Sequence, residues 1–420
     1  MDGVRTKGHA AALGALTAMI RGRAPHALLL VGPAGVGKTT LARDLAAGLL
    51  CTADDPTDRP CGSCRACHLV ASGGHPDLHD LGPEGPGRQV VIGGPGSRAR
   101  GIRDLVSELA LMPVEAGARV AIIRSAERMN DDAQAALLKT LEEPPPGVTL
   151  ILCADAEEPL LPTIRSRCSR VRLGPVGTRD VEAILAEHGV ADPALAARLA
   201  RISGGRPGRA LAWANQPDAL RYRDELTRVL LDLTSARASE RLAAVRSAAA
   251  GASVLAALDA PQGTAPESTA APAVSSRGRR RSSAAPPAEG SRSGTVPGGS
   301  EVSADAGEGA AGDDEPTDDA ILPARTPAAE RRSAAAAVVA IWSDVARDLL
   351  LSQRGLAASL RDPRLLEEAA GVGARIDEAD LVAFIDRVGH AAVLLAANVG
   401  PELVLDDLAL AWPATRSSAA

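Results

Sequence analysis

The feature that most constrains this 420-residue chain is a glycine-rich run, Gly32-Pro33-Ala34-Gly35-Val36-Gly37-Lys38-Thr39-Thr40. It matches the pattern G-x-x-x-x-G-K-[ST] at every fixed position. The apolar residues 27–31 before it predict a buried strand, and residues 39–50 after it predict a helix. A strand, loop and helix in this order direct backbone N–H groups and a helix N-terminus at phosphate groups.

The chemistry expected of this loop is the binding of ATP or ADP with Mg²⁺. Lys38 would contact the β- and γ-phosphates, and the Thr39 hydroxyl would hold the metal. The alternative is a chance match in a glycine-rich chain, and the flanking strand and helix disfavour it. Hydrolysis needs further residues and is a separate question.

Composition limits the class of protein. The 46 basic and 52 acidic residues give a mildly acidic chain, unlike a strongly basic nucleic-acid binder. One Phe, three Trp and one Tyr are too few for base-stacking surfaces. There is no apolar signal core at the start, and no apolar run approaches the ~20 residues that span a membrane. We therefore expect a soluble cytoplasmic protein whose six cysteines form no stable disulfides.

Apolar runs alternate with amphipathic helices over the first part of the chain. This alternation predicts an α/β domain, residues 1–175, with a parallel sheet covered on both faces. The expected strands are 27–31, 120–123, 149–153 and 169–173, and the expected helices include 39–50, 100–110 and 132–141.

The rest of the chain reads as helical. Residues 176–214 predict a small helical domain, and residues 215–415 a second one. An insertion at about 262–334, rich in Ala, Pro, Ser, Gly and Arg, interrupts the second domain and is expected to be disordered. Its Arg277–Arg281 run is either a nucleic-acid contact or, more simply, a solvated run of charge.

Four cysteines lie close together in the sequence, at Cys51, Cys61, Cys64 and Cys67. C-x2-C spacing lets two thiolates reach one ion, and four thiolates close a tetrahedral shell. We therefore predict a structural Zn²⁺ that staples an insertion at residues 51–67. The alternatives are a metal-free cluster, or a site in which His68 replaces one cysteine. Cys153 and Cys168 are expected to be structural.

The acidic pair expected of a phosphate-loop ATPase is missing. Such an enzyme places Asp, often followed by Glu, after a second apolar strand, to organise Mg²⁺ and polarise water. Here strand 120–123 runs into Arg124-Ser125, and Glu127 follows two residues too late. Because the reaction is sensitive to geometry, hydrolysis at this site should be slow or absent.

Three further segments, taken with the phosphate loop and the cysteines, carry a resemblance. They are Leu137-Leu138-Lys139-Thr140-Leu141-Glu142-Glu143-Pro144-Pro145, Thr163-Ile164-Arg165-Ser166-Arg167-Cys168 and Gly204-Gly205-Arg206-Pro207-Gly208-Arg209-Ala210-Leu211. Over residues 8–215 the chain resembles the bacterial sliding-clamp loader subunits of the AAA+ class. The resemblance implies an AAA+ domain, a helical lid domain and a C-terminal collar domain.

Within that family the chain resembles the stator-like delta-prime subunits more than the gamma/tau motor subunits, which carry an Asp-Glu pair where Arg124-Ser125 stand. The His75-Pro76-Asp77 turn also favours delta-prime. This implies assembly with gamma/tau and delta into a hetero-pentamer of the DNA polymerase III holoenzyme, and contact with the sliding clamp and primer-template DNA through that complex. A motor subunit with its own ATPase activity, and a zinc-stabilised scaffold that binds no nucleotide, are the alternatives.

The resemblance also implies roles for single residues. Arg167 would reach a neighbour's γ-phosphate as an arginine finger, whose planar, permanently charged group suits phosphoryl transfer. A salt bridge at the start of a strand is the plainer alternative. Arg209, or Arg206, would sense nucleotide from the lid. Ala154-Asp155 replaces the polar Thr expected on the fourth strand, a second indication of weak hydrolysis.

Overall fold

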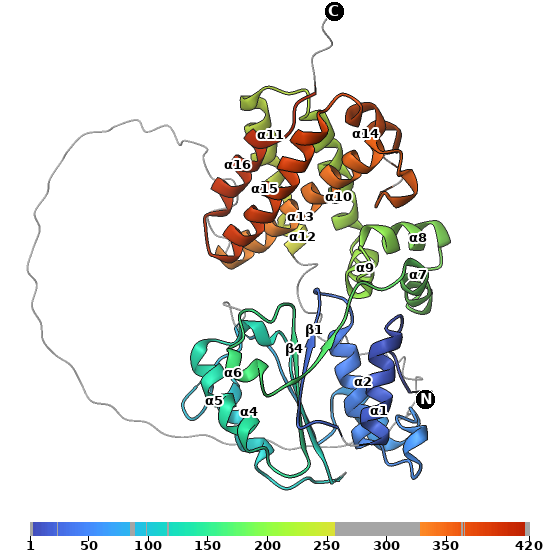
Figure 1. Ribbon diagram of the computed structural model, residues 1–420, viewed down its shortest axis with the longest axis vertical. Coiled ribbons are helices and arrows are strands. Elements are labelled where there is room, and N and C mark those ends of the chain that lie inside the picture. The colour runs from blue at the N-terminus through green and yellow to red at the C-terminus, as the bar shows by residue number, and fades with distance from the viewer. Residues whose placement is uncertain are drawn as a thin grey trace, which may run out of the picture. The chain divides into compact units, whose positions relative to one another are not determined.

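The computed structural model describes residues 3–22, 24–84, 89–97, 99–115, 117–256, 328–362, 364 and 366–415 (Figure 1). The expected insertion lies outside the described residues up to position 327, as does its Arg277–Arg281 run. Among the described helices, none is both long and apolar enough to cross a membrane.

A five-stranded parallel sheet forms the first part of the chain, as the alternating pattern predicted. Its order is β2-β3-β4-β1-β5. The strands are β1 (Ala27–Val31), β2 (Leu78–Leu81), β3 (Arg119–Ile123), β4 (Val148–Ala154) and β5 (Ser169–Arg172). Strand β2 was not predicted, because only its two end residues are buried and its middle residues, His79 and Asp80, are polar.

Helices cover both faces of the sheet (Figure 1). They are α1 (Ala10–Arg21), α2 (Lys38–Leu50), α3 (Arg65–Ser72), α4 (Ile102–Leu109), α5 (Asp131–Glu142) and the short α6 (Pro162–Arg165). Successive side chains of β1 alternate between two cores. Leu28 and Leu30 pack with α1 and α2, whereas Ala27 and Leu29 pack with α4 and α5.

The remaining described elements are helical. They are α7 (Thr178–Glu187), α8 (Pro193–Ile202), α9 (Pro207–Asn215), α10 (Pro217–Asp232), α11 (Ala238–Gly251), α12 (Ser253–Ala256), α13 (Ala328–Gln353), α14 (Leu366–Gly373), α15 (Glu378–Ala396) and α16 (Pro401–Ala411). One hydrophobic cluster runs from α7 to the end of α16. The division into a lid and a collar domain therefore stays a prediction.

Helix α13 corrects one boundary. The expected disordered insertion extended to about residue 334, but α13 begins at Ala328. Alanine has the highest helix propensity, and Ala334 and Ala335 are buried in the helical core. Arg331 also pairs with Glu402 of α16 at 2.7 Å, which ties the first turns of α13 to the C-terminal helices.

Three aromatic side chains anchor the C-terminal helices. Trp342, Phe384 and Trp412 are at most 2 % exposed, and their ring centroids lie 4.7 to 5.7 Å apart. Such contacts stabilise a core beyond the area that they bury. The scarce aromatic residues of this chain thus serve packing in this region.

Candidate nucleotide-binding site and cysteine cluster

The predicted phosphate loop lies between the end of β1 and the start of α2. Gly35 and Gly37 have φ angles of +76° and +110°, in a region that favours glycine. A Cβ atom on Gly32 would lie 2.2 Å from the Leu173 carbonyl oxygen, so the loop also needs glycine there. The residues of the motif therefore adopt the tight turn that lets main-chain N–H groups point together.

Lys38 is the first residue of α2, and its side chain is nearly buried. Its ammonium group donates to the carbonyl oxygens of Gly32 and Pro33, at 2.6 and 2.9 Å. It also pairs with Asp155 Oδ1 at 2.6 Å. Asp155 directly follows β4, so the two positions that the sequence singled out separately lie in contact.

The segment before α1 supports this loop, which the sequence did not indicate. A hydrogen bond of 2.9 Å joins His9 Nε2 to the Val36 carbonyl oxygen. Asp44 of α2 accepts hydrogen bonds from the main-chain N–H groups of Arg5 and Thr6 and from the Thr6 hydroxyl. Burial raises the pKa of Asp44 although these hydrogen bonds oppose it.

The end of β3 carries a cation where an ATPase has its acidic pair. Arg124 Nε lies 2.6 Å from Asp80 Oδ1, and Arg43 of α2 lies 3.0 Å from the other oxygen of Asp80. Ser125 has a φ of +51°, uncommon for a residue with a side chain. Arg124 and Arg43 thus both form ion pairs with the carboxylate of Asp80.

Glu127 comes closer to the loop than its position in the sequence indicated. Its Oε2 accepts the main-chain N–H of Asp155 at 3.1 Å. Burial, and then the charge of Asp155, raise the pKa of the Glu127 carboxyl group. Lys38, Asp155 and Glu127 therefore form a short chain of polar contacts across the ends of β1 and β4.

The two candidate lid arginines differ in their surroundings. Main-chain Gly208 N–H donates to the Gly35 carbonyl oxygen at 2.8 Å, which brings the first turn of α9 against the phosphate loop. The Arg209 guanidinium carbon lies 5.9 Å from the ring centroid of Trp213. Arg206 instead donates to the Ser203 carbonyl oxygen at 3.0 Å. A Cβ atom on Gly35 would lie 3.7 Å from Arg209 Cβ, so Arg209 adjoins the loop. Which of the two arginines senses nucleotide stays a prediction.

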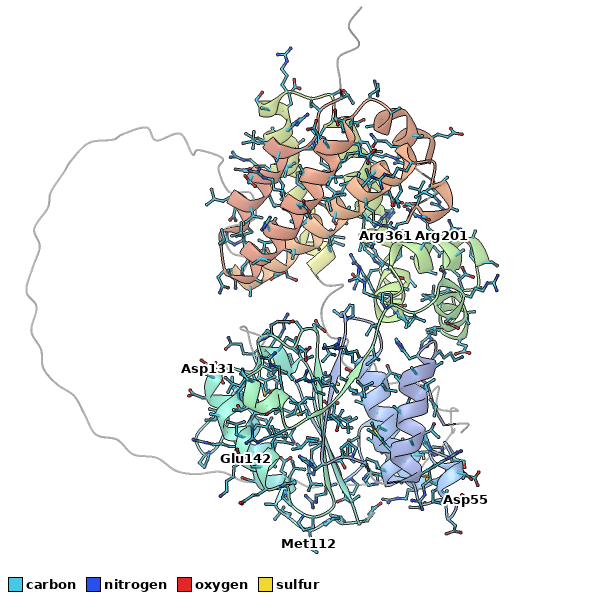
Figure 2. The ribbon with its side chains drawn as sticks, viewed as in Figure 1. Asp55, Met112, Asp131, Glu142, Arg201 and Arg361 are labelled. Carbon is cyan, nitrogen blue, oxygen red and sulfur yellow. The ribbon has the colours of Figure 1, made fainter. Side chains whose placement is uncertain are left out.

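Arg167 follows α6 and is half-buried. Its guanidinium pairs with Glu142, at the end of α5, at 2.7 Å, and donates to the Thr163 carbonyl oxygen at 3.0 Å. Glu142 is labelled in Figure 2. The plainer alternative, a salt bridge, is therefore present within this chain, and it joins two of the segments that carry the resemblance.

The four cysteines meet at one point. Cys51 follows α2 and Cys64 caps α3, and all four sulfur atoms lie within 4.8 Å of one another. Cys51 Sγ is 3.6 Å from Cys61 Sγ and 3.9 Å from Cys64 Sγ. Four thiolates at about 2.3 Å from a tetrahedral ion would be about 3.8 Å apart. The cluster therefore fits a metal without His68.

Main-chain N–H groups donate hydrogen bonds to two of these sulfur atoms, which favours their thiolate form. The N–H groups of Cys64 and Cys67 each donate to the sulfur three residues earlier, at 3.4 Å. Although burial raises the pKa of Cys64, hydrogen bonds from the backbone of Thr52 and Cys67 lower it to about 5. The pKa of Cys67 is raised, first by burial and then by the neighbouring cysteines. A cation at their centre would favour the thiolate form of all four.

The His75-Pro76-Asp77 turn has a structural role that sequence reasoning missed. Asp77 is fully buried and accepts the N–H groups of Val114 and Glu115, at 2.7 and 2.8 Å. Glu115 reaches back to Arg65 of α3 at 2.6 Å. The turn therefore fixes the loop after α4 against the region of the cysteine cluster.

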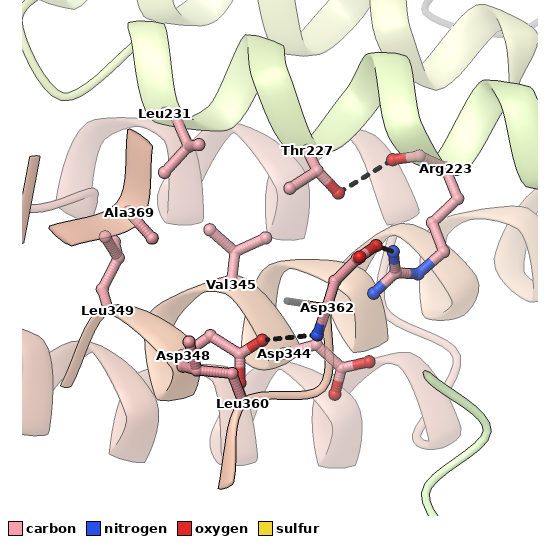
Figure 3. A pocket seen from close by; sticks show the side chains of 10 residues that line it. All are labelled: Arg223, Thr227, Leu231, Asp344, Val345, Asp348, Leu349, Leu360, Asp362 and Ala369. Atoms are coloured by element: carbon pink, nitrogen blue, oxygen red, sulfur yellow. Dashed lines mark hydrogen bonds and ion pairs between the residues drawn. The ribbon is translucent and has the colours of Figure 1, made fainter. Parts of the chain in front are cut away.

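A small cavity lies among the C-terminal helices (Figure 3). Its volume is about 20 Å³, which holds about one water molecule. Asp362 accepts hydrogen bonds from Arg198 of α8 at 2.8 Å and from Arg223 of α10 at 2.9 Å. Asp348 accepts the main-chain N–H groups of Arg361 and Asp362. Both carboxylates already accept hydrogen bonds from within the chain. We therefore interpret the residues around this cavity as a structural cluster of ion pairs rather than a ligand site.

Comparison with known proteins gives matches that each cover part of the chain. The sequence model of the family described as "DNA polymerase III, delta subunit" matches residues 9–177. A DNA polymerase III subunit delta' of Pseudomonas aeruginosa is 39% identical over 46% of this chain and 57% of its own length. That of Escherichia coli is 36% identical over 46% and 55%. The chain thus spans little more than half the length of these relatives.

Other matches carry other names. A DNA polymerase III subunit gamma/tau of Mycobacterium tuberculosis is 34% identical over 47% of this chain and 34% of its own length. Among solved structures, a gamma subunit-related protein of Thermotoga maritima is 18% identical, covers 56% of this chain and 72% of its own, and has a TM-score of 0.32. The RuvB Holliday junction branch migration motor of Thermotoga maritima is 21% identical over 54% and 67%, with a TM-score of 0.33.

Proposed function

We propose that this chain is a clamp-loader subunit of DNA polymerase III, of the delta-prime type. In support, residues 9–177 match the family model described as "DNA polymerase III, delta subunit", and relatives named subunit delta' are 36% and 39% identical over part of the chain. It would be a stator-like member of a hetero-pentamer with gamma/tau and delta subunits. Through that complex it would take part in loading the sliding clamp onto primer-template DNA in the cytoplasm.

The observation that carries the proposal is the end of β3. Arg124 and Ser125 occupy the positions of the acidic pair, and Arg124 is held by Asp80. A guanidinium cannot bind Mg²⁺ or accept a proton from water. The loop residues Gly32–Thr40, with Arg209, would hold ATP or ADP with Mg²⁺, which supplies charge neutralisation for the phosphates. The chain itself would hydrolyse it slowly or not at all.

Arg167 is the residue proposed to act on a neighbour's nucleotide. Its contacts are compatible with that role, because its side chain is 34% exposed and that of its partner Glu142 is 51% exposed. Ion pairs between exposed groups are weak, so an approaching γ-phosphate can compete for Arg167 at small cost.

The C-terminal helices offer a surface for the other subunits. Helices α15 and α16 expose large apolar side chains at Val382, Val393, Leu394, Leu403 and Leu410. Apolar groups on a helical surface lose contact with water when they pack against another subunit. We propose that this surface belongs to the oligomeric collar.

Co-purification tests the proposal. Expressed with a gamma/tau and a delta subunit of one organism, the chain should join a complex that loads clamps onto primed DNA. Failure to assemble would contradict it. ATP turnover by the isolated chain, abolished by Lys38→Ala, would instead favour the motor subunit of the gamma/tau type.

We further propose that Cys51, Cys61, Cys64 and Cys67 hold one structural Zn²⁺. Four sulfurs leave no open position for catalysis. The purified chain should contain about one zinc ion per molecule by elemental analysis. Removing it with a chelator should speed hydrogen exchange in residues 51–67 before the central sheet is affected.

Two cysteine variants make this prediction specific. Cys64→Ser should lose zinc, because it removes one of four ligands, whereas Cys168→Ala, outside the cluster, should keep it. A native chain without zinc, or equal zinc in both variants, would contradict the assignment.

A further inference from the structure

The ammonium group of Lys38 has three hydrogen-bond donors. Its acceptors are the carbonyl oxygens of Gly32 and Pro33 and the carboxylate of Asp155. Both carbonyl groups belong to the phosphate loop itself, and they are neutral. Asp155 is therefore the one charged acceptor among the three, and the one that an anionic phosphate oxygen can replace with the charge pairing preserved.

The main chain fixes the position of Asp155. The residue before it, Ala154, lies in register with Val31, the last residue of β1. The N–H group of Asp155 donates to Glu127 Oε2. Its side chain is 45% exposed, whereas that of Lys38 is 9% exposed. The carboxylate thus lies on the solvent side of Lys38, where β1 passes into the phosphate loop.

Phosphate groups would meet two carboxylates at this place. Like charges a few ångströms apart oppose one another, and more strongly where water is partly excluded. Glu127 is part of that effect, since its carboxyl group is largely buried and faces Asp155. A phosphate can therefore contact Lys38 only if Asp155 gives up its own contact with Lys38. The negative charge of Asp155 then stays close to the phosphate and opposes its binding.

We propose that Asp155 is an internal competitor for the nucleotide phosphates and keeps the affinity of this loop for nucleotide low. The proposal rests on nucleotide binding at the loop, and it adds a residue that sets its strength. It does not depend on Arg167, which would act on a neighbour's nucleotide.

The test is equilibrium binding of ATP with Mg²⁺ to the full-length chain, by calorimetry. Asp155→Asn removes the charge and keeps the size of the side chain, and Asp155→Thr replaces the carboxylate with a hydroxyl group. Both should bind ATP about tenfold more tightly than the native chain, because an ion pair no longer has to be broken. Adding Lys38→Ala to either variant should abolish the gain.

Two matched variants separate the contact from general charge. Asp386→Asn makes the same change on the exposed face of α15 and should leave ATP binding unchanged. Glu127→Gln removes the neighbouring charge but no Lys38 contact, so its gain should be smaller than that of Asp155→Asn. Equal gains from Glu127→Gln and Asp155→Asn would overturn the proposal. No gain from either Asp155 variant would overturn it as well. Assembly with the other subunits is measured separately, so failure here would leave the delta-prime assignment standing.

Discussion

Replacing Asp362 with alanine is expected to lower the free energy of unfolding by about 3–5 kcal/mol. Asp362 bonds Arg198 and Arg223, and all three side chains are at most 7% exposed. Without the carboxylate, two guanidinium groups remain buried with less charge to balance them, and that cost dominates the change. Urea unfolding of the full-length chain measures it.

The exposed pair between Arg387 and Asp407 provides the control. Those side chains are 52% and 48% exposed, so Asp407→Ala should change the free energy of unfolding by no more than ~1 kcal/mol. Similar losses in the two variants would show that burial of the Asp362 cluster does not set its contribution.

The effect of Asp362→Ala should also depend on pH. Although burial raises it, the hydrogen bond from Arg198 and the charge of Arg223 hold the pKa of Asp362 below its usual 3.8. A carboxylate with a lowered pKa stabilises the folded state above its unfolded pKa and loses that contribution as the pH falls through the folded value. The difference between native and variant chains should therefore be constant near neutral pH and shrink below pH ~4.

Local patterns predicted the parts of the fold that depend on neighbours in the sequence. The apolar runs of β1, β3 and β4 are buried on both faces, and such strands are continuous in the sequence. The cysteines were predictable for the same reason, since Cys61, Cys64 and Cys67 lie close together in the sequence. Strand β2 was not predicted, because His79 and Asp80 form ion pairs beside the sheet and do not belong to its core.

Contacts between distant residues could not be predicted from local patterns. The sequence indicates only that Ala154-Asp155 replaces an expected Thr, whereas the pairing of β4 with β1 brings Asp155 to Lys38. Asp362 lies 164 positions from Arg198, and no local pattern connects them. Polar residues whose partners come from another element carry no periodicity, so their roles appear only once the strands and helices are placed.

Replacing Arg167 with alanine is expected to slow the ATPase site that it is proposed to complete by roughly 10³-fold in the reconstituted clamp loader. The reason is that its planar, always-charged guanidinium would no longer neutralise charge that develops on a neighbour's γ-phosphate. Nucleotide binding and folding should be nearly unchanged, since the pair with Glu142 is half-exposed. Release of inorganic phosphate per complex, with clamp and primed DNA present, measures the effect.

Two further variants distinguish a finger from a surface salt bridge. Arg167→Lys keeps the charge but not the planar group, so it should recover only part of the lost rate. Arg172→Ala removes a cation of β5 that pairs with Glu157 and is 70% exposed, and it should leave phosphate release unchanged. If Arg167→Ala also left phosphate release unchanged, its pair with Glu142 would be the whole of its role. The proposal that this chain acts as a stator beside an active neighbour would then lose its support.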